Sequence, residues 1–368
     1  MNQKAKGIIG ILTGGGDVPG LNPAIRAVTI RALREGYKVI GIRRGWKGLV
    51  DVIRDKKVDN SCNYFELTEE IVNKAGRTGG TFLHSSRTRA SHVPQSAVPE
   101  HLKDKYNAEI NDLTPEVLKN LEFIGIDYLI PIGGDDTLSY AVRLSQEGVK
   151  VVAIPKTMDN DVPGTDYCIG FSTCITRTIE LTHDLRTCAG SHERLLVLEV
   201  FGRYAGFSAM LPTLAGAANR CSVVLVSEGA SYSGGQMMFQ SDEADMFGHK
   251  KLGGIGDYVS NELKNLSPKF NKGETINVIN QKLGYLVRCG NPDAMDSIVP
   301  MAYGNLALDL ISKGMHGRLV ILRNGRYDNA PIDIVTSSKK LVDINKFYNT
   351  DRLRPQYNSF EFMPQMIL

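Results

Sequence analysis

The first half of the chain repeats one pattern of apolar and polar positions. A short apolar run is followed by a glycine or polar turn, and then by a stretch whose apolar residues recur about every 3.6 positions. The apolar runs lie at 7–12, 37–42, 128–132, 149–155 and 194–200. The helical stretches lie at 23–36, 138–148 and 207–216. Because continuous β-branched runs that alternate with helices are typical of parallel strands buried on both faces, the pattern predicts an α/β protein with open, doubly wound, mainly parallel sheets.

Each polar turn in this pattern follows a strand. In doubly wound sheets ligands bind beyond the carboxyl ends of the strands, so we expect these turns to meet at one ligand-binding edge. Two segments interrupt the pattern. Residues 90–120 are polar and contain Pro94 and Pro99, which predicts a surface excursion before a short helix. Residues 230–275 are rich in glycine, serine and lysine, and we expect part of this segment to be a mobile loop.

Composition excludes several classes of protein. The 368 residues are enough for two domains, and 42% hydrophobic with 23% charged residues are globular values. A net charge of +3 lacks the concentrated basic face that nucleic-acid binding needs. The six cysteines show no regular spacing, which favours reduced thiols in a cytoplasmic protein. No apolar run approaches the roughly 20 residues that span a bilayer, and no export signal is evident.

The first candidate for chemistry is the glycine loop Thr13–Asp17, TGGGD, which follows a predicted strand. Three glycines let backbone N–H groups approach an anion closely, and the N-terminus of a following helix adds positive potential. The alternative is a tight turn between strand and helix. No Gly-Lys-Ser/Thr follows, so the loop is not a Walker motif.

The turn GGDDT contains two adjacent aspartates, Asp135 and Asp136. A carboxylate beside phosphates usually binds a divalent metal, because Mg²⁺ is held by one or two carboxylates together with phosphate oxygens. A structural alternative is that one of the two caps the next helix, which leaves the other unexplained.

A third turn, PKTMDND, carries Lys156, Thr157, Asp159 and Asp161. Of two acids at i and i+2, one can lie beside a metal while the other accepts a proton from a hydroxyl. The lysine supplies a positive charge for a phosphate. An ordinary polar turn is the alternative here, and it weakens because three such turns share one edge of the sheet.

Arginines next to glycine turns complete the set. They are Arg77, Arg87, Arg89, Arg194 and Arg203. Guanidinium groups suit phosphate oxygens, whereas a lone arginine is usually a solvated surface residue. The set comprises a glycine loop for phosphates, a carboxylate for a metal, a carboxylate that can act as a general base, and several cations. Together they predict a phosphoryl transferase.

The motifs resemble those of the 6-phosphofructokinases. They are LTGGGDVPGLN, GGTFLHSSR, PIGGDDT, IPKTMDNDVPGTDYCIGFSTC, SHERLLVLEVFGRYAG and LGYLVRCGNPDAMDS, in family order over most of residues 7–315. The resemblance implies two Rossmann-like, doubly wound domains in the phosphofructokinase arrangement. It places a phosphoryl-donor domain at 1–170 plus 287–340 and a sugar-phosphate domain at 171–286 plus 341–368.

On the donor side, the resemblance implies that Gly15, with Gly14 and Gly16, binds the donor phosphates through its backbone N–H. It also implies that Asp135 binds Mg²⁺ and that Arg87 steadies the transferring phosphoryl group.

On the acceptor side, the resemblance implies that Asp159 is the general base for the 1-hydroxyl of fructose 6-phosphate, with Asp161 in support. The residues that match the sugar-phosphate site are Thr157, Met158, Asp159, Arg194, Phe201, Gly202, Arg203, Glu228, Tyr285 and Arg288. In relatives the residue matching Arg194 commonly comes from a neighbouring subunit, so we expect a homo-oligomer, a dimer or a tetramer.

The donor is indicated by two positions. Relatives that use ATP usually have glycine at the positions of Asp136 and Lys156, whereas the pyrophosphate-dependent branch has Asp and Lys. Asp136 would put negative charge where the α-phosphate of ATP belongs, and Lys156 would compensate charge on the leaving phosphate. The resemblance therefore implies reversible transfer from pyrophosphate to the 1-hydroxyl of fructose 6-phosphate, in glycolysis or gluconeogenesis. The alternatives are an ATP-dependent 6-phosphofructokinase and a pyrophosphate-dependent kinase that also uses sedoheptulose 7-phosphate.

The chain departs from the family pattern at several positions. Phe201, Tyr285 and Trp46 replace residues common in relatives, and Ile279 stands where an arginine usually meets the 6-phosphate. Cys221 is followed directly by Ser222 where relatives have a further strand, loop and helix. Either the second domain is shortened here, or residues are omitted from the sequence at this junction. A non-catalytic subunit that keeps the fold would be expected to lose its base or its metal acid, and this chain retains both.

Overall fold

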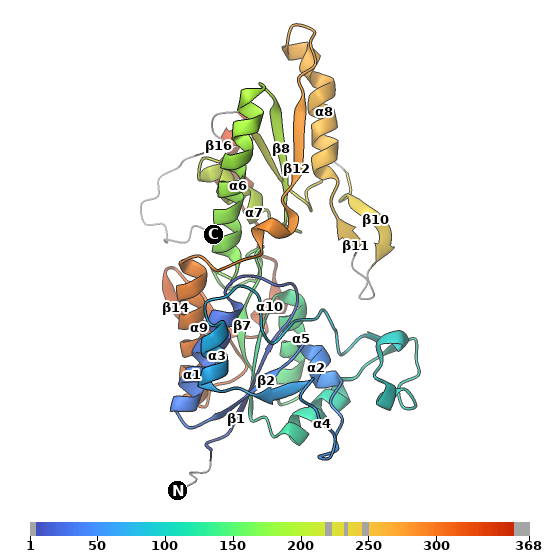
Figure 1. Cartoon of the computed structure of the whole chain (residues 1–368), viewed down its shortest axis with the longest axis vertical. Coiled ribbons are helices and arrows are strands. Elements are labelled where there is room, and N and C mark those ends of the chain that lie inside the picture. Colours follow the sequence, from blue (N-terminus) through green and yellow to red (C-terminus); the bar gives the residue numbers. More distant parts are fainter. Residues whose placement is uncertain (1–4, 218–222, 232–234, 245–249, 357–368) are drawn as a thin grey trace. The chain divides into compact units, whose positions relative to one another are not determined.

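The computed structural model (Figure 1) describes residues 5–217, 223–231, 235–244 and 250–356. The chain forms two compact units. The first contains Met1–Thr157, Val162–Gly170 and Gly290–Lys339, and the second contains Met158–Asp161, Phe171–Cys289 and Lys340–Leu368. The junction of Cys221 with Ser222 lies outside the described residues.

These units differ in detail from the domains that the sequence predicts. Met158–Asp161 belongs to the second unit instead of the first, and residues 287–289 also belong to the second. One cause is local, because the carboxylate of Asp159 accepts a hydrogen bond from the backbone N–H of Arg203, which lies in the second unit. The donor and acceptor roles of the two domains stay predictions.

The first unit is built on a seven-stranded sheet with the strand order β14-β13-β7-β6-β1-β2-β3. Its strands are β1 (Ile8–Thr13), β2 (Lys38–Ile42), β3 (Tyr64–Glu66), β6 (Tyr128–Gly133), β7 (Val152–Pro155), β13 (Arg318–Arg323) and β14 (Arg326–Pro331). The five inner strands are parallel, and β3 and β14 pair antiparallel at the two edges. The predicted α/β fold with a mainly parallel sheet is therefore confirmed.

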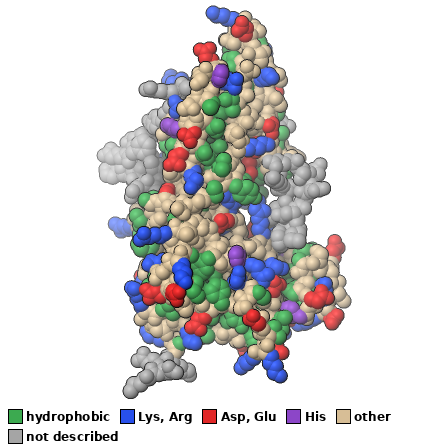
Figure 2. Space-filling model, in the orientation of Figure 1, with side chains coloured by type: hydrophobic (Ala, Val, Ile, Leu, Met, Phe, Trp, Pro, Cys, Tyr) green, Lys and Arg blue, Asp and Glu red, His purple; other side chains and the backbone are tan. Residues whose placement is uncertain are grey.

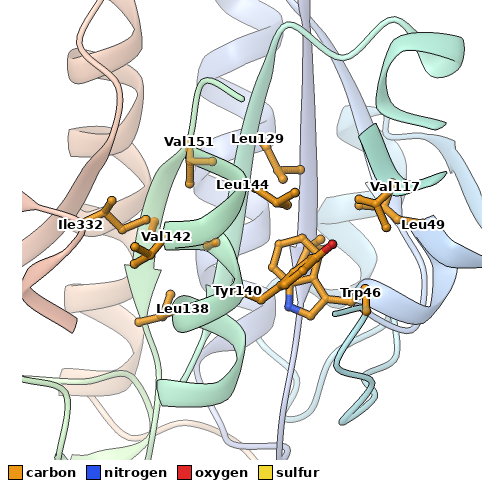
Figure 3. Packing of buried hydrophobic residues seen from close by; sticks show 14 of the residues in the cluster. Trp46, Leu49, Val117, Leu129, Leu138, Tyr140, Val142, Leu144, Val151 and Ile332 are labelled. Atoms are coloured by element: carbon orange, nitrogen blue, oxygen red, sulfur yellow. The ribbon is translucent and has the colours of Figure 1, made fainter. Parts of the chain in front are cut away.

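Helices cover both faces of this sheet (Figure 1). They are α1 (Leu21–Arg34), α2 (Trp46–Val50), α3 (Glu69–Ala75), α4 (Thr114–Ile124), α5 (Asp135–Gln146), α9 (Met295–Ser312) and α10 (Ile334–Ser337). Between α4 or α5 and the sheet lies a buried hydrophobic cluster (Figure 3). Trp46 packs edge-on against Tyr140 there, with 4.9 Å between the ring centroids, so this departure from the family pattern belongs to the core.

The polar segment at 90–120 is a surface excursion, as predicted. It contains the short strands β4 (Val93–Pro94) and β5 (Ile110–Asn111) and two 3-10 turns, Gln95–Ala97 and Glu100–Leu102, before α4 begins.

The second unit is built on a three-stranded parallel sheet with the strand order β12-β8-β9. Its main elements are α6 (Phe171–Ser191), β8 (Leu195–Val200), α7 (Phe207–Leu214), β9 (Val223–Ser227), β10 (Phe239–Ala244), β11 (Lys250–Leu252), α8 (Ile255–Phe270) and β12 (Val278–Lys282). Short elements follow: the 3-10 turn Gly284–Val287, α11 (Ile344–Phe347), β15 (Tyr348–Asn349) and β16 (Arg354–Pro355).

Helix α8 occupies part of the segment 230–275, and the expectation of a mobile loop in another part of that segment stays a prediction. Its buried positions include Gly256, Ser260 and Ser267, which are small or polar. Its apolar residues Ile255, Val259, Leu263 and Leu266 nevertheless recur at helical spacing, so the helical pattern is present in the sequence.

Charged side chains of both signs are interspersed on the face shown in Figure 2. Among the described residues, no helix is both long and apolar enough to cross a membrane.

One buried carboxylate, Glu116 of α4, links the surface excursion to Arg54, which lies after α2. Its side chain is 1% exposed and accepts hydrogen bonds from Arg54 (2.5 Å), Lys105 and the hydroxyl of Tyr106 (3.1 Å). Burial alone would raise the pKa of this carboxyl, but the bonds from Lys105, Arg54 and Tyr106 outweigh it and lower the pKa from 4.5 to about 2.

We expect Glu116→Gln to lower the free energy of unfolding at pH 7 by about 1–3 kcal/mol, because cationic donors lose their charged acceptor. Since the pKa is lowered in the folded state, this stabilisation is present above the ordinary pKa of 4.5 and is lost as the pH falls from 4.5 toward about 2. Urea unfolding of both proteins across that range measures it. Glu100→Gln is the control, because Glu100 is 87% exposed in its pair with Lys103. An equal effect of both substitutions would contradict this account.

Candidate active site

The first glycine of the TGGGD loop is required by packing. The backbone N–H of Gly14 donates to the carbonyl of Ile132 in β6 at 3.0 Å. A Cβ atom at Gly14 would lie 2.4 Å from the hydroxyl oxygen of Thr137 in α5, which is closer than real Cβ atoms come. The close approach of the loop to the start of α5 therefore explains Gly14 without a ligand.

Gly15 is held differently from what the sequence predicts. Its backbone N–H, expected to bind a donor phosphate, donates to the carbonyl of Ser86 at 2.9 Å. The hydroxyl of Ser85 in turn donates to the Gly15 carbonyl at 2.6 Å. Phosphate binding by this N–H stays a prediction, and it requires the bond to Ser86 to open. The absence of a side chain at Gly15 leaves room for the ammonium group of Lys156, because a Cβ atom there would lie 3.3 Å from its nitrogen.

The helix predicted at 23–36 is α1, and it begins two residues earlier than expected. Helix α1 starts at Leu21, four residues beyond Asp17, and its N-cap is Gly20. A Cβ at Gly20 would lie 2.6 Å from Ile169 and 2.9 Å from the carbonyl oxygen of Asp296. The N-terminus of α1 thus packs against Ile169 and Asp296, and its contribution to an anion site at the glycine loop stays a prediction.

A buried ammonium group supplies positive charge at the glycine loop. Lys156 follows β7 directly, is 3% exposed, and donates from Nζ to the carbonyl oxygen of Gly16 at 2.7 Å. Its backbone N–H donates to the carbonyl of Gly133, which ends β6. Three strand ends, those of β1, β6 and β7, therefore meet here, as the doubly wound pattern predicts.

Asp135 and Asp136 form the first turn of α5, whose N-cap is Gly134. Carboxylates in the first turn of a helix are favoured by its dipole, so neither aspartate is out of place in the local structure. Asp136 pairs with Arg89, with 2.6 Å between the carboxylate and guanidinium. Arg89 was predicted as a phosphate ligand, and in this structure it binds a neighbouring carboxylate. Arg77 and Arg87 are exposed in the same loop region.

The described residues contain no group of three or more histidine, cysteine or acidic side chains placed to hold a metal. A site for Mg²⁺ does not need such a group, since one or two carboxylates suffice when the substrate brings phosphate oxygens. Asp135, at the carboxyl end of β6, fits a site of that kind.

In the second unit, Asp159 is a buried carboxylate with a perturbed pKa. Burial, followed by the negative charge of Asp161, raises its pKa from 3.8 to about 6. The hydrogen bond from the Arg203 N–H (3.3 Å) and the charges of Arg203 and Arg288 lower it in part. A carboxylate with a pKa near 6 is ionised at neutral pH and can accept a proton, as a general base must.

Glu228 lies beside this aspartate. It follows β9, and its backbone N–H donates to the carbonyl of Val200 at 2.9 Å. Burial, followed by the charge of Asp159, raises the pKa of the Glu228 carboxyl to about 7, while Arg203 lowers it. Near neutral pH this carboxyl is therefore often protonated and able to donate a hydrogen bond to a hydroxyl group.

Two aromatic rings hold the guanidinium of Arg288. It lies 5.5 Å from the ring centroid of Phe201 and 5.9 Å from that of Tyr285, and the two rings meet edge-on at 5.5 Å. Tyr285 is 73% exposed, so a ligand has access to this cluster. Phe201 and Tyr285, which depart from the family pattern, thus position a cation.

Gly202 and Arg194 complete the predicted acceptor residues. Gly202 has a φ of 149°, and a Cβ there would lie 2.3 Å from the hydroxyl oxygen of Ser208, so the turn requires glycine. Arg194 stands before β8, whereas Phe201–Arg203 follow it. The six residues of the strand separate the two by about 20 Å, so within one chain Arg194 does not join the residues around Asp159.

Sequence reasoning missed Ser85 and Ser86, which fix Gly15. They stand directly before Arg87, but nothing in that spacing indicates a bond to a loop 71 residues earlier.

Comparison with known proteins places these observations in a family. The family model described as phosphofructokinase matches residues 8–311. The chain is 34% identical to ATP-dependent 6-phosphofructokinase 3 of Streptomyces coelicolor, over 91% of this chain and 96% of that protein. It is 33% identical to the pyrophosphate–fructose 6-phosphate 1-phosphotransferase of Amycolatopsis methanolica, over 92% and 97%. The crystal structure of a pyrophosphate-dependent phosphofructokinase from Nitrosospira multiformis has the same fold, with a TM-score of 0.71, 16% identity and coverage of 99% and 92%.

Proposed function

The chain belongs to the phosphofructokinase family of glycolytic kinases, and within it we propose that the phosphoryl donor is pyrophosphate. The protein transfers a phosphoryl group to the 1-hydroxyl of fructose 6-phosphate and yields fructose 1,6-bisphosphate and phosphate, reversibly. The observation that carries the choice of donor is the buried ammonium of Lys156 against the glycine loop. A charged group removed from water at that loop is suited to an inorganic leaving group, which brings no nucleotide contacts of its own.

Each residue then has a defined role. Asp159 accepts the proton of the 1-hydroxyl as its oxygen attacks phosphorus, and Arg203 holds the carboxylate of Asp159 through its backbone N–H. Lys156 and Arg87 stabilise the negative charge on the transferring and leaving phosphates. Arg288, fixed between Phe201 and Tyr285, binds the phosphate of the sugar.

Phosphofructokinases generally use a divalent metal, and we propose Mg²⁺ held by Asp135. The ion would supply positive charge that offsets the negative charge of the phosphate oxygens.

Relatives of similar identity are named for both donors, which makes ATP the second candidate. The proteins named ATP-dependent come from Streptomyces coelicolor and Mycobacterium tuberculosis and are 33–34% identical to this chain.

The sugar specificity is the second open choice. Ile279 lies in β12 and pairs in register with Leu196 of β8. Its side chain has no hydrogen-bond donor for a phosphate. Arg203 and Arg288, whose charges both act on Asp159 and Glu228, are then the cations proposed for the sugar phosphate. Use of sedoheptulose 7-phosphate beside fructose 6-phosphate is the corresponding proposal.

The place of Arg194 supports the proposal of a homo-oligomer. It stands at the far end of β8 from Arg203, so its predicted contact with the sugar phosphate requires a second copy of the chain.

The reverse reaction tests the proposed function. We expect fructose 1,6-bisphosphate and inorganic phosphate, with Mg²⁺ and without any nucleotide, to yield fructose 6-phosphate and pyrophosphate. Coupled detection of fructose 6-phosphate measures the rate. A strict requirement for ADP in this direction would refute the proposal.

A further inference from the structure

Arg89 and Asp136 form an ion pair beside the glycine loop. The guanidinium and carboxylate are 2.6 Å apart, with 39% and 45% of their side chains exposed. Arg89 stands three residues after Ser86, whose carbonyl accepts the N–H of Gly15. The loop that carries Arg89 is therefore bound to the glycine loop at one point and to the first turn of α5 at another.

The stability of the fold does not explain this pair. Ion pairs with this exposure contribute little to the free energy of unfolding, because water and salt screen them. The other end of α5 carries a matched pair, Arg143 with Asp112, at 2.7 Å and with 40% and 42% exposure. The seven residues from Asp136 to Arg143 place the matched pair about 10 Å further along the helix, away from the glycine loop.

The charges indicate another role. A carboxylate that repels the α-phosphate of ATP would also repel pyrophosphate, which is itself a polyanion. Arg89 compensates the charge of Asp136 and leaves the two side chains in place as a bulky, neutral pair. At the same time Asp136 occupies donors of a guanidinium that would otherwise suit a polyphosphate.

We propose that Arg89 is a specificity-determining residue whose guanidinium Asp136 withholds from nucleotide phosphates. This inference rests on the proposed function and deepens it, because selection of the donor then depends on the pair and not on one repelling charge. When Asp136 is absent, Arg89 binds a phosphate of ATP.

A double-mutant cycle tests the inference by binding as well as by activity. We expect Asp136→Gly to tighten the binding of magnesium ATP at least about tenfold, measured by titration calorimetry without sugar. In the double variant Asp136→Gly, Arg89→Ala, we expect most of this gain to disappear. Arg89→Ala alone should weaken pyrophosphate binding about five- to tenfold, because the charge of Asp136 is then uncompensated.

Two further variants separate this role from a structural one. Arg89→Lys, which keeps the charge, should recover pyrophosphate binding in part, and Arg143→Ala should leave the binding of both donors unchanged. If Asp136→Gly tightens ATP binding by the same factor with and without Arg89, the inference is overturned. If the unaltered protein shows no activity with pyrophosphate, the proposed function is refuted instead. The comparison of ATP binding with and without Arg89 still decides the role of Arg89 in that case.

Discussion

Replacement of Asp159 by asparagine is expected to lower kcat by about 10³-fold and to leave the KM for fructose 6-phosphate within about threefold. Asparagine keeps the size and the hydrogen bond that the carboxylate accepts from the Arg203 N–H, but it does not accept a proton. The loss therefore falls on the chemical step. Steady-state kinetics with pyrophosphate as the donor measure it.

The pH dependence gives a second result for the same residue. A general base works when deprotonated, so kcat/KM should fall as the pH drops below about 6, the raised pKa of Asp159. Because Asp159 interacts with Glu228, whose pKa is raised to about 7, the apparent value belongs to the pair. In Asp159→Asn this acidic limb should disappear. Asp184→Asn, an exposed aspartate of α6, is the control and should keep both rate and profile. An unchanged kcat in Asp159→Asn removes this residue as the base.

Lys156→Met is expected to lower kcat with pyrophosphate by about 10²- to 10³-fold. Methionine approximates the length of the lysine stem but removes the ammonium that donates to the Gly16 carbonyl. The leaving phosphate then loses its nearest buried cation. Since the second unit binds the sugar in the proposed function, the KM for fructose 6-phosphate should change little.

The control for this substitution lies at the other end of the same strand. Lys150 precedes β7, and its ammonium lies 5.2 Å from the ring centroid of Tyr128. Lys150→Met should leave kcat unchanged. Urea unfolding of Lys156→Met excludes simple loss of the fold. A folded Lys156→Met protein with normal turnover would show that the ammonium does not act on the donor.

Much of the fold could be predicted from local pattern. The strands β1, β6, β7 and β8 were found within two or three residues, because each is a continuous apolar run next to a glycine or polar turn. Helix α8 was missed, because the glycine, serine and lysine content of 230–275 indicated a loop and outweighed the helical spacing of Ile255, Val259 and Leu263. The start of α1 was found within two residues, although its N-cap Gly20 packs against Ile169 and Asp296, which are far away in the sequence.

The candidate site shows the same division. That the glycine loop, the GGDDT turn and Lys156 meet at one edge follows from strands that end together, which a sequence pattern contains. The bond from Gly15 to Ser86 and the pair of Arg89 with Asp136 join residues 71 and 47 positions apart. No periodicity in the sequence encodes such contacts. Nothing in the sequence therefore indicated that Arg89 pairs with Asp136, and Arg89 was predicted as a phosphate ligand.

The central claim is that fixed charges at the glycine loop select pyrophosphate over ATP. The most direct test measures kcat/KM for both donors with the unaltered protein, fructose 6-phosphate and Mg²⁺. The account predicts a preference for pyrophosphate of at least about 100-fold, the size expected from a few kcal/mol of electrostatic discrimination. Equal values, or a preference for ATP, would contradict it.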